Sequence, residues 1–219
     1  MSGKSAAMVL SGCGHVDGTE IREAVLALLA LEKHKVKVKF FAPDIEQKEV
    51  INHITKDVMA GEKRNVLLEA ARIARGDIED LKNAKVQDFD MLVIPGGYGA
   101  AKNLSNFAVS QENVSILPEL QNLILEFFKA KKPIGAICIS PAVLVAALKG
   151  HAHDIEVTIG DDSDGLIEKL GGKHIKCSAN QSAADSKHKI FSCPAYMQDG
   201  DVYQIYLGIE SMVESVLKC

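Results

Sequence analysis

Residues 133–142 read "PIGAICISPA". The apolar run up to Ile137 is typical of a buried strand, and the run that begins at Pro141 is typical of a helix. Cys138 stands between the two, where an α/β fold places a nucleophile on a strand-to-helix turn. A thiol there lies at the positive end of the helix, which favours the thiolate and lowers the pKa. The same position also suits a buried core cysteine, so position alone leaves both interpretations open.

A second stretch, "PGGYG" at 95–99, follows the plainest buried strand of the chain, "FDMLVI". Two adjacent glycines after a strand allow the backbone to approach a ligand closely. The amides of Gly96 and Gly97, together with the amide of Ile139, are candidates for an oxyanion hole. A tight strand-to-helix turn is the simpler interpretation of this stretch taken alone.

Outward from these two stretches, short apolar runs alternate with helical patterns. Strands are predicted over 6–12, 35–44, 89–97 and 133–139, and helices are predicted over 65–75, 116–130, 141–150 and 200–218, with a further helix after Thr19. Continuous apolar strands that alternate with helices predict an α/β fold with a parallel sheet covered by helices on both faces. No linker or repeat interrupts the pattern, so one domain over 1–219 is expected.

Ligands bind at the carboxyl ends of the strands in such sheets, which directs attention to three loops. The first, "SGCGHVDG" at 11–18, has glycine spacing one residue too long for a dinucleotide fingerprint. Acidic residues follow it at the start of a helix, where capping alone can explain them. The predicted substrate contacts at these strand ends are Cys13, His15, Asp17, Gly96, Tyr98, Lys102 and Asn103.

Composition restricts the class of protein. The net charge of −4 provides no basic surface for a nucleic acid, and no apolar stretch is long enough to span a bilayer. The five cysteines are scattered, without Cys-x-x-Cys pairs or zinc-type spacing, which fits free thiols in a reducing compartment. Neither a metal site nor a cofactor is expected. The short apolar run near the N-terminus does not fit a signal peptide, so a cytoplasmic protein is expected.

The chain resembles the DJ-1/PfpI superfamily, whose architecture is shared with class I glutamine amidotransferases, and more closely its ES1 family with the bacterial ElbB-like members. The matching stretches run in order along nearly the whole chain; they include "SGCGHVDGTEIREAV", "IPGGYGAAKNLSNFA", "CISPA", "VTIGDD" and "CPAYM". The resemblance implies a flavodoxin-like three-layer sandwich and a homodimer.

The resemblance also implies the catalytic groups. Cys138 would be the nucleophile, and amides at Gly97 and Ile139 would form the oxyanion hole. A glutamate of the first helix hydrogen-bonds the cysteine in the DJ-1 branch, and Glu20 is the first choice here, with Glu23 left open. A buried, protonated carboxyl can donate to a thiolate and stabilise it.

One position departs from the superfamily. A histidine is expected after the nucleophile helix, and this chain has Gly160 in "EVTIGDD". Without a Cys–His pair, amide and peptide hydrolysis are both doubtful. His15, His151 and His153 are the candidate substitutes, and Asp161 also lies near the missing histidine. The polar stretch 42–64 is interpreted as an insertion that covers the site or forms a dimer contact.

Two functions remain open from the sequence. The leading hypothesis is a cysteine-dependent, glyoxalase-like enzyme that acts without glutathione on small 2-oxoaldehydes, with Cys138 as nucleophile and Glu20 moving the proton, helped by Asp17 or His15. The alternative is a redox-sensing or regulatory protein with an oxidisable Cys138, for which Cys13 would act as the resolving thiol. A third possibility is an amidotransferase paralogue that has lost its histidine.

Overall fold

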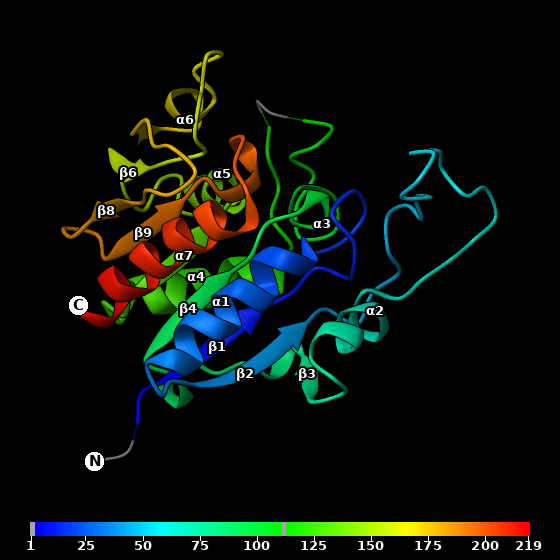
Figure 1. Ribbon diagram of the computed structural model, residues 1–219, viewed down its shortest axis with the longest axis horizontal. Helices are drawn as coiled ribbons and strands as arrows, with labels where there is room; N and C mark the ends of the chain where they lie inside the picture. The colour runs from blue at the N-terminus through cyan, green and yellow to red at the C-terminus, as the bar shows by residue number, and fades with distance from the viewer. Residues whose placement is uncertain (1–2, 111–112) are drawn as a thin grey trace.

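The central feature of the fold is a twisted sheet in the order β3-β2-β1-β4-β5-β9-β8 (Figure 1). The computed structural model describes residues 3–110 and 113–219. The strands are β1 (Ser5–Val9), β2 (Lys37–Ala42), β3 (Ile78–Asp80), β4 (Met91–Ile94), β5 (Ile134–Ile137), β8 (Ala183–Asp185) and β9 (Ile190–Cys193). Every pairing is parallel except β8 with β9. A separate parallel pair joins β6 (Ile155–Val157) to β7 (Gly172–His174).

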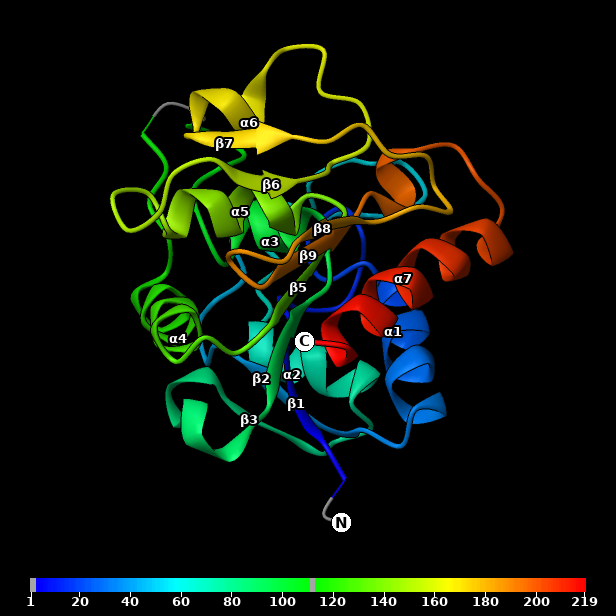
Figure 2. The same cartoon turned by 90° about the vertical axis from the view of Figure 1, so that its left-hand side faces the viewer.

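Helices cover both faces of the sheet. They are α1 (Ile21–Lys33), α2 (Val66–Ile73), α3 (Tyr98–Lys102), α4 (Pro118–Lys129), α5 (Ser140–Ala147), α6 (Leu166–Lys169) and α7 (Val202–Leu217), with 3-10 turns η1 (Leu81–Asn83), η2 (Val86–Asp88) and η3 (Ala195–Met197). Figure 2 shows α1 and α7 on one side of the sheet and α4 on the other. The predicted three-layer α/β fold is therefore confirmed. No helix in the described ranges is both long and apolar enough to cross a bilayer.

Alternation along the strands builds two cores. In β1, Ala7 and Val9 face the core shared with α4 and α5, whereas Ala6 and Met8 face the core shared with α1 and α7. Burial on both faces explains why these strands read as continuous apolar runs rather than alternating ones. The carboxyl ends of β1, β4 and β5 meet at one edge of the sheet, which brings together the loops after each strand.

Helix α1 buries a face made mainly of its small side chains. Ala24, Ala27 and Ala30 are fully buried, whereas Val25 and Leu29 are 47% and 52% exposed. Small residues allow the helix to approach the sheet closely, and Leu31 at its end is the one large apolar side chain of α1 that is fully buried. Glu23 lies on the buried face with the alanines, and its side chain is fully buried.

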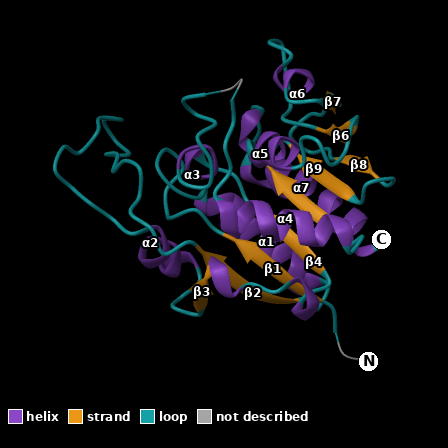
Figure 3. Cartoon of the chain, turned by 180° about the vertical axis from the view of Figure 1, so that it is seen from behind, coloured by secondary structure: helices purple, strands orange, loops and turns teal. Residues whose placement is uncertain are grey.

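The predicted insertion at 42–64 is a long loop that projects from the body of the molecule (Figure 3). Two isolated bridges, Glu46 with Asn65 and Ile51 with Val58, close it on itself. Its base docks against the loop 11–18 and the end of α3, and its tip is exposed. The loop therefore buttresses the first glycine loop more than it covers the pocket at Cys138.

Candidate active site

Cys138 occupies a strained turn between β5 and α5. Its φ of 64° lies in the left-handed region, which non-glycine residues seldom adopt and which is often found at functional sites. The backbone amide of Cys138 donates to the carbonyl of Cys193 at 2.9 Å, which anchors the turn to the end of β9. The side chain is 8% exposed, and it lines a cavity. The turn thus holds a nearly buried thiol at the edge of a pocket.

Glu23, and not Glu20, is the carboxyl beside the thiol. The Glu23 side chain reaches Cys138 within hydrogen-bonding distance and also accepts from the amide of Gly96 at 3.0 Å. Glu20 instead caps helix α1, where its side chain accepts from the amide of Glu23 at 2.6 Å. The first choice of Glu20 as the partner of the cysteine is therefore wrong. The reason is geometric, since the cap lies outside the first turn and the third helical position faces the sheet.

The two adjacent glycines of "PGGYG", Gly96 and Gly97, have different roles. The amide of Gly96 is used on Glu23, so it is not free for an oxyanion. A Cβ at Gly96 would collide with the Cβ of Cys138, which explains why no larger residue fits there. The amides of Gly97 and Ile139 both point at the Cys138 sulfur. These two donors are the ones placed to bind a negative charge that develops beside the thiol.

Burial governs the protonation of this pair. It raises the pKa of Glu23 to about 8, because the carboxylate would be fully desolvated. Burial also raises the pKa of Cys138 above its ordinary value, Glu23 adds to that rise, and the amides of Gly97 and Ile139 oppose it. The lowered thiol pKa expected from the helix terminus is therefore not found, since desolvation outweighs it. Glu23 is therefore the group of the pair that loses its proton first, and Cys138 remains a neutral thiol to higher pH.

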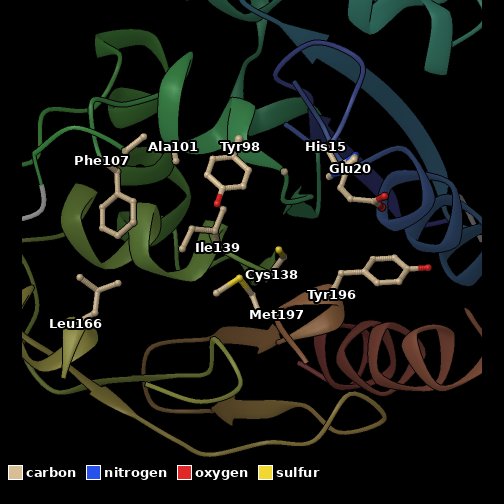
Figure 4. Close-up of a pocket in the computed structure, with 12 residues that line it drawn as sticks. His15, Glu20, Tyr98, Ala101, Phe107, Cys138, Ile139, Leu166, Tyr196 and Met197 are labelled. Carbon is tan, nitrogen blue, oxygen red and sulfur yellow. The ribbon is translucent and has the colours of Figure 1, made fainter. Parts of the chain in front are cut away.

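The cavity beside Cys138 has a volume of about 570 Å³. Its lining residues are His15, Glu20, Gly97, Tyr98, Ala101, Phe107, Ala108, Cys138, Ile139, Leu166, Tyr196 and Met197 (Figure 4). Of these, sequence reasoning singled out His15, Glu20, Gly97, Tyr98, Cys138 and Ile139. Tyr196 and Met197 were quoted only as part of "CPAYM", and Ala101, Phe107 and Ala108 only as part of "IPGGYGAAKNLSNFA". The remaining residue, Leu166, carried no chemical signal.

Three residues predicted to contact the substrate instead form hydrogen bonds or an ion pair within the protein. Asp17 is 2% exposed, and its Oδ2 accepts from the amide of Ile51 at 2.8 Å. Asn103 donates to the carbonyls of Ser11 and Asp17, both at 2.9 Å. Lys102 pairs with Glu49 at 2.7 Å.

Neither these three residues nor Cys13 line the cavity at Cys138. Cys13 lies in the field of Glu69 and Arg72 of α2, and burial raises the pKa of its thiol. The prediction that Asp17, Asn103, Lys102 and Cys13 contact substrate is therefore not supported, because their polar atoms are directed at backbone, at an ion-pair partner or toward α2.

The missing histidine has one candidate replacement at the cavity. His15 lines it, and its ring makes an edge contact with His53, with centroids 5.2 Å apart. Burial, Lys56 and His53 together lower the pKa of His15, which favours the neutral imidazole. His151 and His153 are exposed and do not line the cavity. Asp161 pairs with Lys176 at 3.3 Å, also away from the cavity.

The described residues that line the cavity do not form a group with metal-compatible spacing. Within residues 3–110 and 113–219, the one group with metal-compatible spacing is His34, Glu210 and Glu214, and none of the three lines the cavity. Lys33 already pairs with Glu210 there. This cluster of exposed and half-exposed side chains is therefore best described as a surface ion-pair network.

A cysteine on a strained turn at the carboxyl edge of a flavodoxin-like sheet defines the amidotransferase-like class of α/β proteins. Within that class the chain belongs to the DJ-1/PfpI family, which matches residues 15–162. It is 41% identical to the human glutamine amidotransferase-like class 1 domain-containing protein 3, mitochondrial, and 40% identical to the rat ES1 protein homolog, mitochondrial; each alignment covers 97% of this chain and 82% of the relative. The predicted resemblance to the ES1 family is confirmed.

A solved structure supports the same assignment. An isoprenoid biosynthesis protein with an amidotransferase-like domain from Ehrlichia chaffeensis is 52% identical, covers 98% of both chains and has a TM-score of 0.93. The expectation of a cytoplasmic protein is wrong by these comparisons, since both curated relatives are named as mitochondrial. Composition indicates solubility and thiol chemistry, whereas the compartment is set by a targeting signal, which the folded domain does not encode.

Proposed function

We propose that this protein is a cysteine-dependent, glyoxalase-like enzyme that converts 2-oxoaldehydes to 2-hydroxy acids without glutathione. The observation that carries the proposal is the set of groups around Cys138. A buried acid, Glu23, contacts the thiol, and the amides of Gly97 and Ile139 point at it, all beside one cavity. A nucleophile, a proton carrier and an oxyanion site are what this reaction needs.

The proposed reaction needs no external oxidant. The Cys138 thiol gives up its proton and adds to the aldehyde carbon, a C–S bond forms in place of the carbonyl π bond, and the carbonyl oxygen, which accepts from the Gly97 and Ile139 amides, takes up a proton. Transfer of the proton from the aldehyde carbon to the neighbouring carbonyl carbon then gives a 2-hydroxy thioester. Water cleaves the C–S bond and releases the hydroxy acid and the thiol. The first carbon is oxidised as the second is reduced, so electrons balance within the substrate.

Glu23 takes the proton-transfer role that was predicted for Glu20. Its raised pKa of about 8 lets it donate and accept protons near neutral pH. His15 is a second group at the cavity for this role, whereas Asp17 is excluded because it faces the loop 42–64. This chemistry requires neither a metal nor an organic cofactor.

The test is turnover of methylglyoxal by Cys138→Ala, with Cys13→Ser as the matched control. We expect the Cys138 variant to lose at least about 10³-fold in kcat/KM, as for other nucleophile deletions. Cys13→Ser should retain turnover, because Cys13 does not line the cavity. Full activity in Cys138→Ala would refute the proposal.

A second arm measures alkylation of each cysteine by limiting iodoacetamide as a function of pH. Because burial and Glu23 raise the pKa of the Cys138 thiol, its alkylation should rise only at alkaline pH, and methylglyoxal should protect it. The exposed Cys219 should not be protected, and if methylglyoxal does not slow the alkylation of Cys138 either, the turn is scaffold.

The alternative function, redox sensing by Cys138, can be tested separately. Cys13 lies in the field of α2 residues and does not line the cavity of Cys138, which disfavours it as a resolving thiol. Peptide mapping after mild peroxide would show a Cys13–Cys138 disulfide if the sensing hypothesis is right. A glutaminase activity is disfavoured because Gly160 stands at the expected histidine position, and His174, whose Nε2 accepts from the amide of Ile159 at 3.4 Å, does not line the cavity.

The proposal includes a location and an assembly. The names of the two curated relatives support a mitochondrial location, which is a reducing compartment suited to free thiols. The exposed apolar residues of α1 support the expected homodimer. One domain spanning residues 1–219 remains the proposed organisation.

A further inference from the structure

The cavity at Cys138 has two chemically different ends. In Figure 4, His15 and Glu20 lie on one side of Cys138, whereas Phe107 and Leu166 lie on the other, beyond Ile139. Ala101 lies with Phe107 on that second side. A substrate whose reacting carbonyls sit at Cys138 therefore has a polar wall on one side and an apolar chamber on the other.

The cavity is larger than a three-carbon substrate needs. Its volume of about 570 Å³ is within the range of pockets that enclose drug-sized ligands. Apart from Tyr98, whose hydroxyl points toward Ile139 in Figure 4, the residues that would meet the rest of the substrate have hydrocarbon or thioether side chains: Ala101, Phe107, Ala108, Ile139, Leu166 and Met197. Glyoxal and methylglyoxal would leave most of this surface unused.

The chamber also lacks a partner for an anion. Among the described residues, none that lines the cavity is Lys or Arg. Three cations contact residues of the cavity wall from outside it: Lys102 pairs with Glu49 at 2.7 Å, whereas Lys56 lies 3.2 Å from His15 and Arg22 lies 3.5 Å from the Tyr196 hydroxyl, both at the end away from the apolar side chains (Figure 4). A carboxylate or phosphate on the distal end of a substrate would be desolvated without compensation.

We propose that the apolar chamber binds the substituent of the 2-oxoaldehyde, so that the preferred substrates are neutral 2-oxoaldehydes with an extended alkyl or aryl group. This inference rests on the proposed glyoxalase-like function and narrows it to a substrate class. Binding of the substituent would hold the aldehyde carbon at the Cys138 sulfur. Phe107 and Leu166 would then be specificity residues.

The test compares kcat/KM for methylglyoxal, 2-oxohexanal, phenylglyoxal and a 2-oxoaldehyde of 2-oxohexanal's length that ends in a carboxylate. The alkyl pair shares its carbonyl chemistry, so a difference between them reports on the chamber. We expect 2-oxohexanal and phenylglyoxal to exceed methylglyoxal by at least about tenfold. The carboxylated compound should fall below 2-oxohexanal by at least the same factor.

Two variants test whether the preference for longer substrates arises in the apolar chamber. Ala108→Leu fills the chamber from an exposed position, and Leu166→Gln makes it polar at nearly constant size. Each should lower kcat/KM for 2-oxohexanal more than kcat/KM for methylglyoxal, so that the ratio of the two values falls by at least about tenfold. Ala130→Leu, at the exposed end of α4 and outside the cavity, is the matched control and should change neither.

The outcomes separate the two proposals. If methylglyoxal is turned over in a Cys138-dependent manner but longer neutral substrates are no better, the chamber inference is overturned and the proposed function stands. If no 2-oxoaldehyde is turned over above the Cys138→Ala background, both are overturned. A preference for the carboxylated compound would also contradict the inference.

Discussion

Two clusters of polar residues lie close together at the carboxyl edge of the sheet, and they differ in what their polar atoms face. At Cys138, Glu23 and the amides of Gly97 and Ile139 surround a thiol that lines the cavity. In the cluster formed by Asp17 and Asn103, both side chains bind backbone groups of the loops 11–18 and 42–64, and the second carboxylate oxygen of Asp17 lies 3.6 Å from His53 Nε2.

The comparison shows that a position at the carboxyl end of a strand is necessary for a residue of the active site but is not sufficient. Both clusters follow glycine-rich loops, and both carry residue types that bind substrates in other proteins. Only the first leaves donors directed at a reactive atom beside a cavity. The second orders a long loop, because buried backbone groups need partners.

The largest expected effect separates the two glutamates. Glu23→Gln should lower kcat for methylglyoxal by about 10²–10⁴-fold, because the amide can donate to the sulfur but cannot carry a proton between carbons. Glu20→Gln, the matched variant at the helix cap, should keep kcat within about tenfold of the parent. Steady-state kinetics of both variants checks this, and equal losses would show that the contact of Glu23 with Cys138 has no special role.

The same Glu23 contact predicts a pH-dependent stability. A carboxyl whose pKa is raised to about 8 by folding binds a proton that the unfolded chain releases near pH 4.5. The stabilisation is therefore full below pH 4.5 and is lost as the pH rises through about 8. By pH 9 the loss amounts to about 5 kcal/mol.

Urea unfolding of the wild-type protein and of Glu23→Gln at several pH values measures this loss. The variant should be less pH-dependent, so its advantage over the wild-type protein should grow from pH 5 to pH 9. Parallel stability curves for the two proteins would show that Glu23 is ionised in the folded state across this range.

The Asp17–Asn103 cluster should affect stability and leave the chemistry intact. Asn103→Ala removes bonds to Ser11, Asp17 and Lys48, so we expect a loss of about 1–3 kcal/mol in the free energy of unfolding. Limited proteolysis should cut faster within the exposed stretch 53–64. The rate of Cys138 alkylation should not change. A loss of alkylation without loss of stability would move Asn103 back to the substrate site.

The smallest expected effect on the fold is at the exposed face of α1. Val25 and Leu29 are 47% and 52% exposed, so Val25→Glu should change the free energy of unfolding by no more than about 0.5 kcal/mol. If this face forms the homodimer contact, light scattering should show the mass falling to that of one chain. An unchanged dimer would place the contact elsewhere.

Several features were predictable because they depend on local pattern. The apolar runs and their breaks at glycines were enough to predict a parallel sheet, and the "PIGAICISPA" turn identified Cys138 with Ile139. Glu23 was harder to choose, since Val25 and Leu29 look like the apolar face of α1 and the small alanines do not. An alanine-rich face is a weak hydrophobic signal, yet it is the one that packs closest to the sheet.

The sequence by itself determined the layers of the fold, the strained cysteine turn and the glycine amide beside it, because strand period, helix period and turn chemistry act over a few residues. Only the tertiary structure decided which acid meets the thiol, which polar residues bind backbone instead of ligand, and that Phe107 and Leu166 share a cavity with Cys138. Those choices depend on the direction of side chains on elements that are distant in the chain. They are fixed when the helices pack against the sheet.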